Sequence, residues 1–103
     1  MKKALIIAGI AACCLSAPVF ADPAADAKKA GCMNCHAVDK KVVGPSFKDI
    51  SAKYKGDAGA VDKMIAKVNA GGSGSFGPMP MPAQKGRLPD AEMKAVVTWA
   101  LAQ

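Results

Sequence analysis

Two cysteines and a histidine stand within five consecutive residues, Cys32-Met33-Asn34-Cys35-His36. Two thiols three positions apart can reach both vinyl groups of one porphyrin, and a histidine directly after them is the arrangement that attaches a c-type haem covalently. A neutral imidazole is also a good iron ligand. The motif therefore predicts one covalently bound haem c, attached through Cys32 and Cys35, with His36 as the proximal iron ligand.

One proximal histidine leaves the sixth coordination position of the iron open. The chain has a single histidine, so a second imidazole from this chain is excluded. A thioether is the soft donor of His/Met sites, and residues 77–82 (Gly-Pro-Met-Pro-Met-Pro) present two methionines in a loop stiffened by prolines. Met64 and Met93 lie at apolar helical positions and are expected to fill the core. The residues themselves leave Met79 and Met81 both open as sixth ligand.

Three other uses of these cysteines are disfavoured by the rest of the sequence. A disulfide between Cys32 and Cys35 would close a very small loop and stabilise little. A thiol oxidoreductase normally carries its C-x-x-C motif in a βαβ context, and no strand-like alternation of useful length occurs here. A zinc site lacks an apparent fourth ligand beside the two thiols and the imidazole.

The first 21 residues have the pattern of a secretory signal peptide. Lys2 and Lys3 give a basic start, residues 4–15 are apolar, and Val19 and Ala21 stand at the positions that a cut after Ala21 requires. The apolar run is too short to span a bilayer as a stable helix. We therefore expect export, cleavage after Ala21 and no stable membrane insertion.

A rival processing site lies inside this leader. Residues 10–13 (Ile-Ala-Ala-Cys) resemble a bacterial lipobox, which would make Cys13 a lipidated N-terminus. The apolar segment before it would be very short, so cleavage after Ala21 is the favoured interpretation. That cleavage leaves residues 22–103 as a single mature domain in the periplasm.

The size and charge of the mature domain limit its partners and its core. Because Lys2 and Lys3 lie in the leader, cleavage lowers the formal net charge from +6 to +4. A modestly basic surface suits an acidic protein partner or an anionic membrane surface, and no basic patch interleaved with aromatics indicates nucleic-acid binding. A domain of about 80 residues is marginal on its own core. A buried porphyrin would supply the missing apolar mass.

Helix-forming segments dominate the mature chain. Caps and apolar spacing predict helices over residues 24–30, 47–54 and 58–69 and from Pro89 onward. Glycines and prolines favour a loop over residues 37–46 and a long irregular binding loop over residues 71–89. The sequence thus predicts an all-α domain of four to five helices.

With these features the sequence resembles the small bacterial class I cytochromes c, which are monohaem electron carriers. The resemblance covers essentially all of residues 22–103 and rests on residues 31–36, 43–45 (Val-Gly-Pro) and 77–82 and on the C-terminal helix with Trp99. It implies the cytochrome c fold around one covalently attached haem. It also implies single-electron transfer to a reductase or terminal oxidase. In that family the methionine of the P-x-P-M-P run is the axial ligand, and that residue here is Met81.

The resemblance also implies roles for three residues near the haem and places one departure beside them. Pro45 is expected to accept, through its carbonyl oxygen, a hydrogen bond from His36 that fixes the imidazole. Gln84 stands where some relatives place an asparagine that bonds the ligand sulfur. Lys67 stands where some carry an arginine that holds a haem propionate, but lysine lacks the bidentate fork. Relatives often have a tryptophan that bonds the same propionate where this chain has Phe76, which cannot donate.

The leading hypothesis is a carrier rather than an enzyme, because a six-coordinate His/Met iron has no open site for substrate. The alternative is a haem-based sensor or peroxidase-like enzyme in which Met81 leaves the iron. We expect a monomer with acidic redox protein partners and no nucleic-acid partner. Nine basic residues favour such a partner: Lys28, Lys29, Lys40, Lys41, Lys48, Lys53, Lys55, Lys85 and Arg87.

Overall fold

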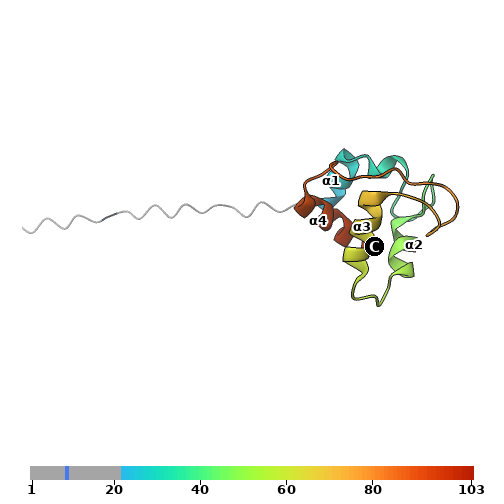
Figure 1. The fold of residues 1–103 in the computed structure, drawn as a ribbon. Helices are drawn as coiled ribbons and strands as arrows, with labels where there is room; N and C mark the ends of the chain where they lie inside the picture. Colours follow the sequence, from blue (N-terminus) through green and yellow to red (C-terminus); the bar gives the residue numbers. More distant parts are fainter. Residues whose placement is uncertain (1–8, 10–21) are drawn as a thin grey trace, which may run out of the picture.

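The computed structural model of the chain describes Gly9 and residues 22–103. The predicted signal peptide apart from Gly9, its cleavage after Ala21 and the rival lipidation at Cys13 fall outside the described residues. The described part contains four α-helices and one 3₁₀ helix and no strand (Figure 1), which confirms the all-α prediction. In chain order these are α1 (Pro23–Lys29), η1 (Cys32–Asn34), α2 (Phe47–Lys53), α3 (Ala60–Ala70) and α4 (Asp90–Leu101).

The caps at the start and end of α1 explain where it begins and ends. Asp22 accepts a hydrogen bond of 3.1 Å from the backbone N–H of Ala25, and Pro23 occupies the first turn, where no N–H is needed. Gly31, with φ of 85°, turns the chain from α1 into η1. This left-handed conformation favours glycine, so the haem-attachment motif begins directly at a fixed turn.

The remaining helices lie close to the predicted segments. Ser46 caps α2 by accepting a 3.0 Å hydrogen bond from the N–H of Asp49. The prediction that α4 starts with Pro89 is off by one residue, because Pro89 is extended, with ψ of 148°, and precedes the first helical residue. None of the helices in the described part is long and apolar enough to cross a membrane.

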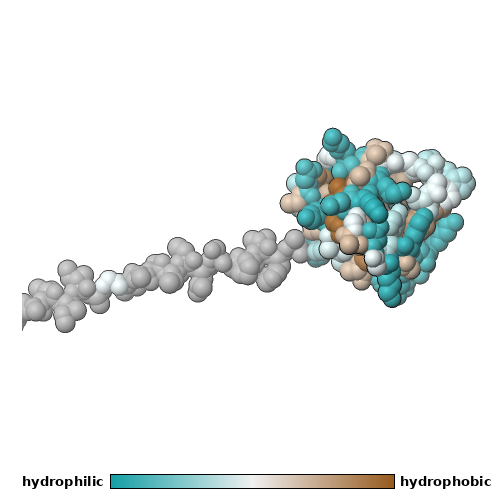
Figure 2. Space-filling view, turned by 60° about the horizontal axis from the view of Figure 1, so that its bottom comes forward, coloured by the Kyte–Doolittle hydropathy of each residue, from teal (hydrophilic) through white to brown (hydrophobic). Residues whose placement is uncertain are grey.

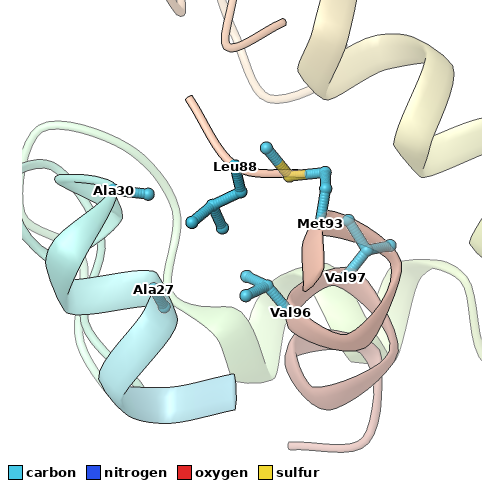
Figure 3. Packing of buried hydrophobic residues seen from close by; sticks show 6 residues of the cluster. All are labelled: Ala27, Ala30, Leu88, Met93, Val96 and Val97. Atoms are coloured by element: carbon cyan, nitrogen blue, oxygen red, sulfur yellow. The ribbon is translucent and has the colours of Figure 1, made fainter. Parts of the chain in front are cut away.

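Helix α4 is the element on which the other helices pack, since α1, α2 and α3 all contact it. The first core cluster joins α1, the residue Leu88 and α4 (Figure 3). Leu88 points into the space between the alanines of α1 and the apolar face of α4. Because alanine is small, α1 approaches α4 closely. The cluster consists of Ala27, Ala30, Leu88, Met93, Val96 and Val97.

A second core cluster joins α2 to the end of α4 and consists of Phe47, Ile50 and Ala100. Cys32 and Met64 are partly buried and pack against both clusters. The predicted core role is thus confirmed for Met93, which is buried, whereas Met64 is half-buried. The haem-attachment motif therefore begins at the junction of the two clusters.

The long segment between α3 and α4 is irregular, as predicted, and runs around the outside of the helices (Figure 1). Its sequence between residues 71 and 82 is rich in glycine and proline. Figure 2 shows a mostly hydrophilic face, with a pale margin on the side where Figure 1 places this segment. The loop that carries both candidate methionines is therefore a surface element, whereas His36 itself is buried.

Candidate haem-binding site

The imidazole of His36 is oriented by the loop that follows it. Its Nδ1 lies 2.7 Å from the carbonyl oxygen of Pro45, which is the hydrogen bond expected for that residue. Because a carbonyl oxygen only accepts, Nδ1 carries the proton and Nε2 keeps its lone pair. This is the tautomer of a histidine that ligates a metal through Nε2. Among the described residues, the hydrogen bond found for this side chain is made by Nδ1, and none is made by Nε2.

Gly44 lies directly against this imidazole. A Cβ at this position would stand 2.7 Å from Cε1 and 3.0 Å from Nδ1 of His36, which is closer than real Cβ contacts. The backbone N–H of Gly44 also donates a 2.7 Å hydrogen bond to the carbonyl oxygen of Cys35. The loop therefore reaches the ring only because residue 44 has no side chain.

Phe47, the first residue of α2, stacks on the His36 ring. The two ring centroids are 5.3 Å apart with an interplanar angle of 26°. Trp99 of α4 then meets Phe47 edge-on, at 5.2 Å and 69°. Such pairs are favourable aromatic geometries. The imidazole, which is only 9% exposed, is thus connected through Phe47 to the core beneath α4.

The two thiols lie on the single turn that ends in this histidine. The N–H groups of Cys35 and His36 both donate to the carbonyl oxygen of Cys32, at 3.3 and 3.0 Å. Both thiols are free and half-buried. Burial raises the pKa of the Cys32 thiol above its ordinary value. The two thiols therefore stand on one backbone turn, as covalent attachment to one porphyrin requires.

The backbone of Met81 is held by paired hydrogen bonds to Gly72. The N–H of Met81 donates to the Gly72 carbonyl at 2.8 Å, and the N–H of Gly72 donates back at 2.9 Å. At Gly71, φ is 69° and a Cβ would stand 2.6 Å from the carbonyl oxygen of Met81. The N–H of Gln84 then donates to the Val68 carbonyl of α3 at 2.9 Å. Met81 is therefore fixed beside the end of α3.

Met79 lies in a different environment, although it is only two residues away. Its side chain is 62% exposed, whereas Met81 is half-buried. In the part of the chain that the structure describes, the backbone of Met79 makes no hydrogen bond. The geometry thus favours Met81 over Met79 as a fixed ligand.

Lys67 and Gln84, the other two residues with a role expected near the haem, have other contacts in this structure. Lys67 donates from Nζ to Ser75 Oγ at 2.5 Å. The side-chain amide of Gln84 donates to the carbonyl oxygen of Pro82 at 2.7 Å. Phe76 is 38% exposed. The expected roles of Lys67 toward a propionate and of Gln84 toward the ligand sulfur stay predictions.

The donor set fits a haem iron better than a bare metal ion. No three His, Cys, Asp or Glu side chains of the described residues come together to hold a metal ion. An iron at His36 Nε2 must therefore bring further ligands, as a porphyrin does. The apolar side chains Val61, Met64, Ile65 and Val68 of α3 are only partly buried, so they still have apolar surface that a porphyrin can cover.

A family model for cytochrome c matches residues 21–102. The chain belongs to the cytochrome c family. It is 52% identical over 75 residues to cytochrome c-551 of Allochromatium vinosum, a match that covers 73% of this chain and 79% of that relative. It is 42% identical over 101 residues to cytochrome c-552 of Hydrogenobacter thermophilus, which covers 98% and 97%. The crystal structure of wild-type Nitrosomonas europaea cytochrome c552 is similar in fold, with 43% identity and a TM-score of 0.72 over 77% of this chain and 96% of that one.

These relatives confirm a small class I monohaem cytochrome c. A cytochrome of this class carries one covalently attached haem c and acts as an electron carrier, so this chain is an electron-transfer protein and not an enzyme. Its partners are redox proteins. The haem supplies the redox chemistry, and the protein supplies its binding, orientation and electrostatics.

Several residues that shape this site were not predicted as such from the sequence. The sequence indicates Gly44 only as a loop breaker and part of the family motif, although a glycine beside Pro45 is an available sign of a close approach. Phe47 is predicted only as part of an amphipathic helix. The pairing of Gly72 with Met81 has no sign in the sequence, because the two residues are brought together by the folded loop.

Proposed function

We propose that this cytochrome shuttles single electrons through a closed, six-coordinate haem iron whose axial ligands are His36 and Met81. Cys32 and Cys35 form the covalent thioether links. The observation that carries the proposal is the contrast between Met81, which is half-buried and paired with Gly72, and the exposed Met79. When bound, the haem supplies a one-electron iron couple whose potential is raised by His/Met ligation.

The residues of the chain orient the His36 imidazole and exclude small molecules from the iron. The Pro45 carbonyl fixes the tautomer of His36 and would increase the electron donation of its ring toward a bound iron. Gly44 and Phe47 restrict the ring to one position. A Met81 thioether that binds the iron would close it to small molecules. Ligands that stay in place in both oxidation states suit a protein that only passes electrons.

Matched substitutions of the two methionines test this coordination. Met81→Ala should abolish the weak sulfur-to-iron absorption near the red end of the visible spectrum. It should also lower the reduction potential by on the order of 0.1 V or more, within the span of about 0.8 V over which haem potentials are tuned. Met79→Ala should change neither. An unchanged potential in Met81→Ala would transfer the ligand role to Met79.

Carbon monoxide binding separates the carrier from the alternative. A closed iron binds carbon monoxide weakly in the native reduced protein at neutral pH. Strong binding under these conditions would contradict the closed carrier. It would favour a haem-based sensor or peroxidase-like enzyme in which Met81 leaves the iron.

We further propose that the redox partner presents an acidic surface to a monomeric cytochrome. All nine basic residues named for this role are exposed. The electron-transfer rate with such a partner should fall as ionic strength rises, because salt screens the attraction. A rate independent of salt would contradict the acidic partner, and a dimer in analytical ultracentrifugation would contradict the monomer.

Export to the periplasm is the last part of the proposal. Residues 1–21 are a signal peptide that is cleaved after Ala21, which leaves residues 22–103 as the mature cytochrome c domain. The intact mass of the purified, haem-loaded protein tests this directly. A mass that includes a lipid on Cys13, or an uncleaved leader, would contradict it.

A further inference from the structure

The loop that carries Met81 is closed by backbone hydrogen bonds at two levels. The paired bonds between Gly72 and Met81 form its base. Farther out, the N–H of Gly74 donates to the carbonyl oxygen of Gly77 at 2.8 Å. The two residues between these glycines, Ser75 and Phe76, form the loop tip. The loop is thus a short hairpin-like segment whose tip lies away from the Met81 backbone.

Two lysines from two different helices contact the loop tip. Lys53, the last residue of α2, donates from Nζ to the carbonyl oxygen of Ser75. The same ammonium lies 4.5 Å from the ring centroid of Phe76, which is within cation–π range. Lys67, in the last turn of α3, donates to Ser75 Oγ. The loop tip is therefore connected to α2 and to α3 by side chains.

Neither of these lysines forms an ion pair with a carboxylate of the described residues. The one ion pair found among the described residues joins Lys63 to Asp57, at 2.8 Å. Lys53 and Lys67 instead place both of their ammonium groups on the loop tip, where they meet a carbonyl oxygen, a hydroxyl and an aromatic ring. Hydrogen bonds from charged donors are stronger than neutral ones. The position of the loop tip therefore depends on these two side chains.

We propose that Lys53 and Lys67 are positioning residues that keep Met81 at the iron by fixing the loop tip. The inference rests on the proposed His36/Met81 coordination. Positive φ values at four glycines, Gly71, Gly72, Gly74 and Gly77, give this backbone conformations that few other residues adopt. A tip that is released from α2 and α3 leaves the Gly72 pairing and the bond from the Gln84 N–H to the Val68 carbonyl as the backbone contacts that hold Met81. The lysines thus act through the loop and touch neither iron nor porphyrin in this role.

Imidazole binding to the oxidised, haem-loaded protein measures how often Met81 leaves the iron. The apparent affinity of the added ligand rises with the fraction of molecules whose sixth position is open. Lys53→Gln should raise the imidazole association constant by about threefold, and Lys53→Gln with Lys67→Gln by about tenfold. Lys53→Arg, which keeps a cation and donors, should restore the native value. Lys55→Gln removes the same charge two residues away and should have no effect on imidazole affinity, since the side-chain hydrogen bonds and the cation–π contact found at the loop tip among the described residues come from Lys53 and Lys67.

The outcomes distinguish this inference from the coordination on which it rests. If the native protein lacks the sulfur-to-iron absorption, the Met81 coordination fails, and the positioning role fails with it. If that absorption is present but the double variant binds imidazole like the native protein, only the positioning role is overturned. A changed pH dependence of the potential with unchanged imidazole affinity would also overturn it, because the ammonium groups would then serve the haem carboxylates.

A second variant covers the case in which the lysine variants do not fold. Phe76→Leu removes the ring that faces Lys53 and leaves the hydrogen bonds to Ser75 in place. It should raise imidazole affinity in the same direction as Lys53→Gln but by less, about twofold. An unchanged affinity in Phe76→Leu would mean that the cation–π contact has no part in holding the loop tip.

Discussion

The segment that presents His36 and the segment that presents Met81 are stabilised by different means. His36 is buried, its Nδ1 bonds the Pro45 carbonyl, and its ring stacks on Phe47 of the core. Met81 lies on a glycine- and proline-rich surface loop that is held by backbone pairing with Gly72. One ligand is thus part of the core, whereas the other depends on a few contacts of a loop.

This difference indicates where the site should fail first. Core packing gives the His36 side many neighbours that must all be disturbed before the imidazole moves. A surface loop with few buried contacts opens at lower free energy than the core. Perturbation of the protein should therefore release the sixth ligand while the proximal ligand and the covalent links remain.

The largest expected effect comes from the attachment motif itself. Cys32→Ala with Cys35→Ala should abolish covalent haem and leave no stably folded domain, because a core of this size is marginal without the porphyrin. The helix content from circular dichroism and the haem retained on a denaturing gel report both losses. Asn34→Ala is the matched control, since this exposed residue lies in the same turn. A folded double variant without haem would contradict the claim that haem completes the core.

Alanine substitutions at two glycines should affect the Met81 side and the His36 side differently. Gly71→Ala combines a positive φ with a Cβ that collides with the Met81 carbonyl, so it should lower the free energy of unfolding by about 2–4 kcal/mol and weaken the sulfur-to-iron absorption. Gly44→Ala collides with the imidazole without a strained φ. This substitution should lower the free energy of unfolding by about 1–3 kcal/mol and leave the sulfur-to-iron absorption in place. Denaturant titrations and visible spectra measure both.

Gly86→Ala is the control for these two variants. Gly86 has φ of 84°, but an added Cβ would meet open space. Only backbone strain should therefore lower the free energy of unfolding, by about 1–2 kcal/mol. If Gly71→Ala behaves like Gly86→Ala in stability and spectrum, the collision with Met81 has no consequence. Loss of the absorption in Gly44→Ala would remove the distinction between the two sides.

The smallest expected effect concerns Phe76. Phe76→Trp introduces an indole N–H at the loop tip, and such a donor should shift the reduction potential or its pH dependence through a haem propionate. A redox titration over a range of pH measures this. An unchanged profile would mean that the propionate is held elsewhere, and it would leave the Met81 side without a propionate contact at residue 76.

The local features of this molecule could be predicted from the sequence because they depend on near neighbours. The Asp22 cap and Gly31 determine the limits of α1, and the spacing of Cys32, Cys35 and His36 indicates haem attachment without tertiary information. The helices α2 to α4 follow from apolar periodicity. The start of α4 was wrong by one residue because Pro89 caps the helix and does not enter it.

The contacts across the site could not be predicted, because they join distant segments. The approach of Gly44 to His36 requires the folded loop of residues 37–46. The hydrogen bond from Lys53 to the Ser75 carbonyl joins residues 22 positions apart. The spacing of residues along the chain does not indicate this contact. The choice between Met79 and Met81 likewise depended on resemblance at the sequence level, whereas the structure adds burial and backbone pairing as independent support.

Methyl NMR of the reduced, haem-loaded protein shows which methionine is the sixth iron ligand. With methionine methyl groups labelled, the ring current of the porphyrin shifts the methyl of an axial methionine far upfield of all others. Coordination by Met81 gives one such resonance that is absent in Met81→Leu and present in Met79→Leu. A shifted resonance that disappears in Met79→Leu, or no shifted resonance in the native protein, would exclude Met81 as the ligand.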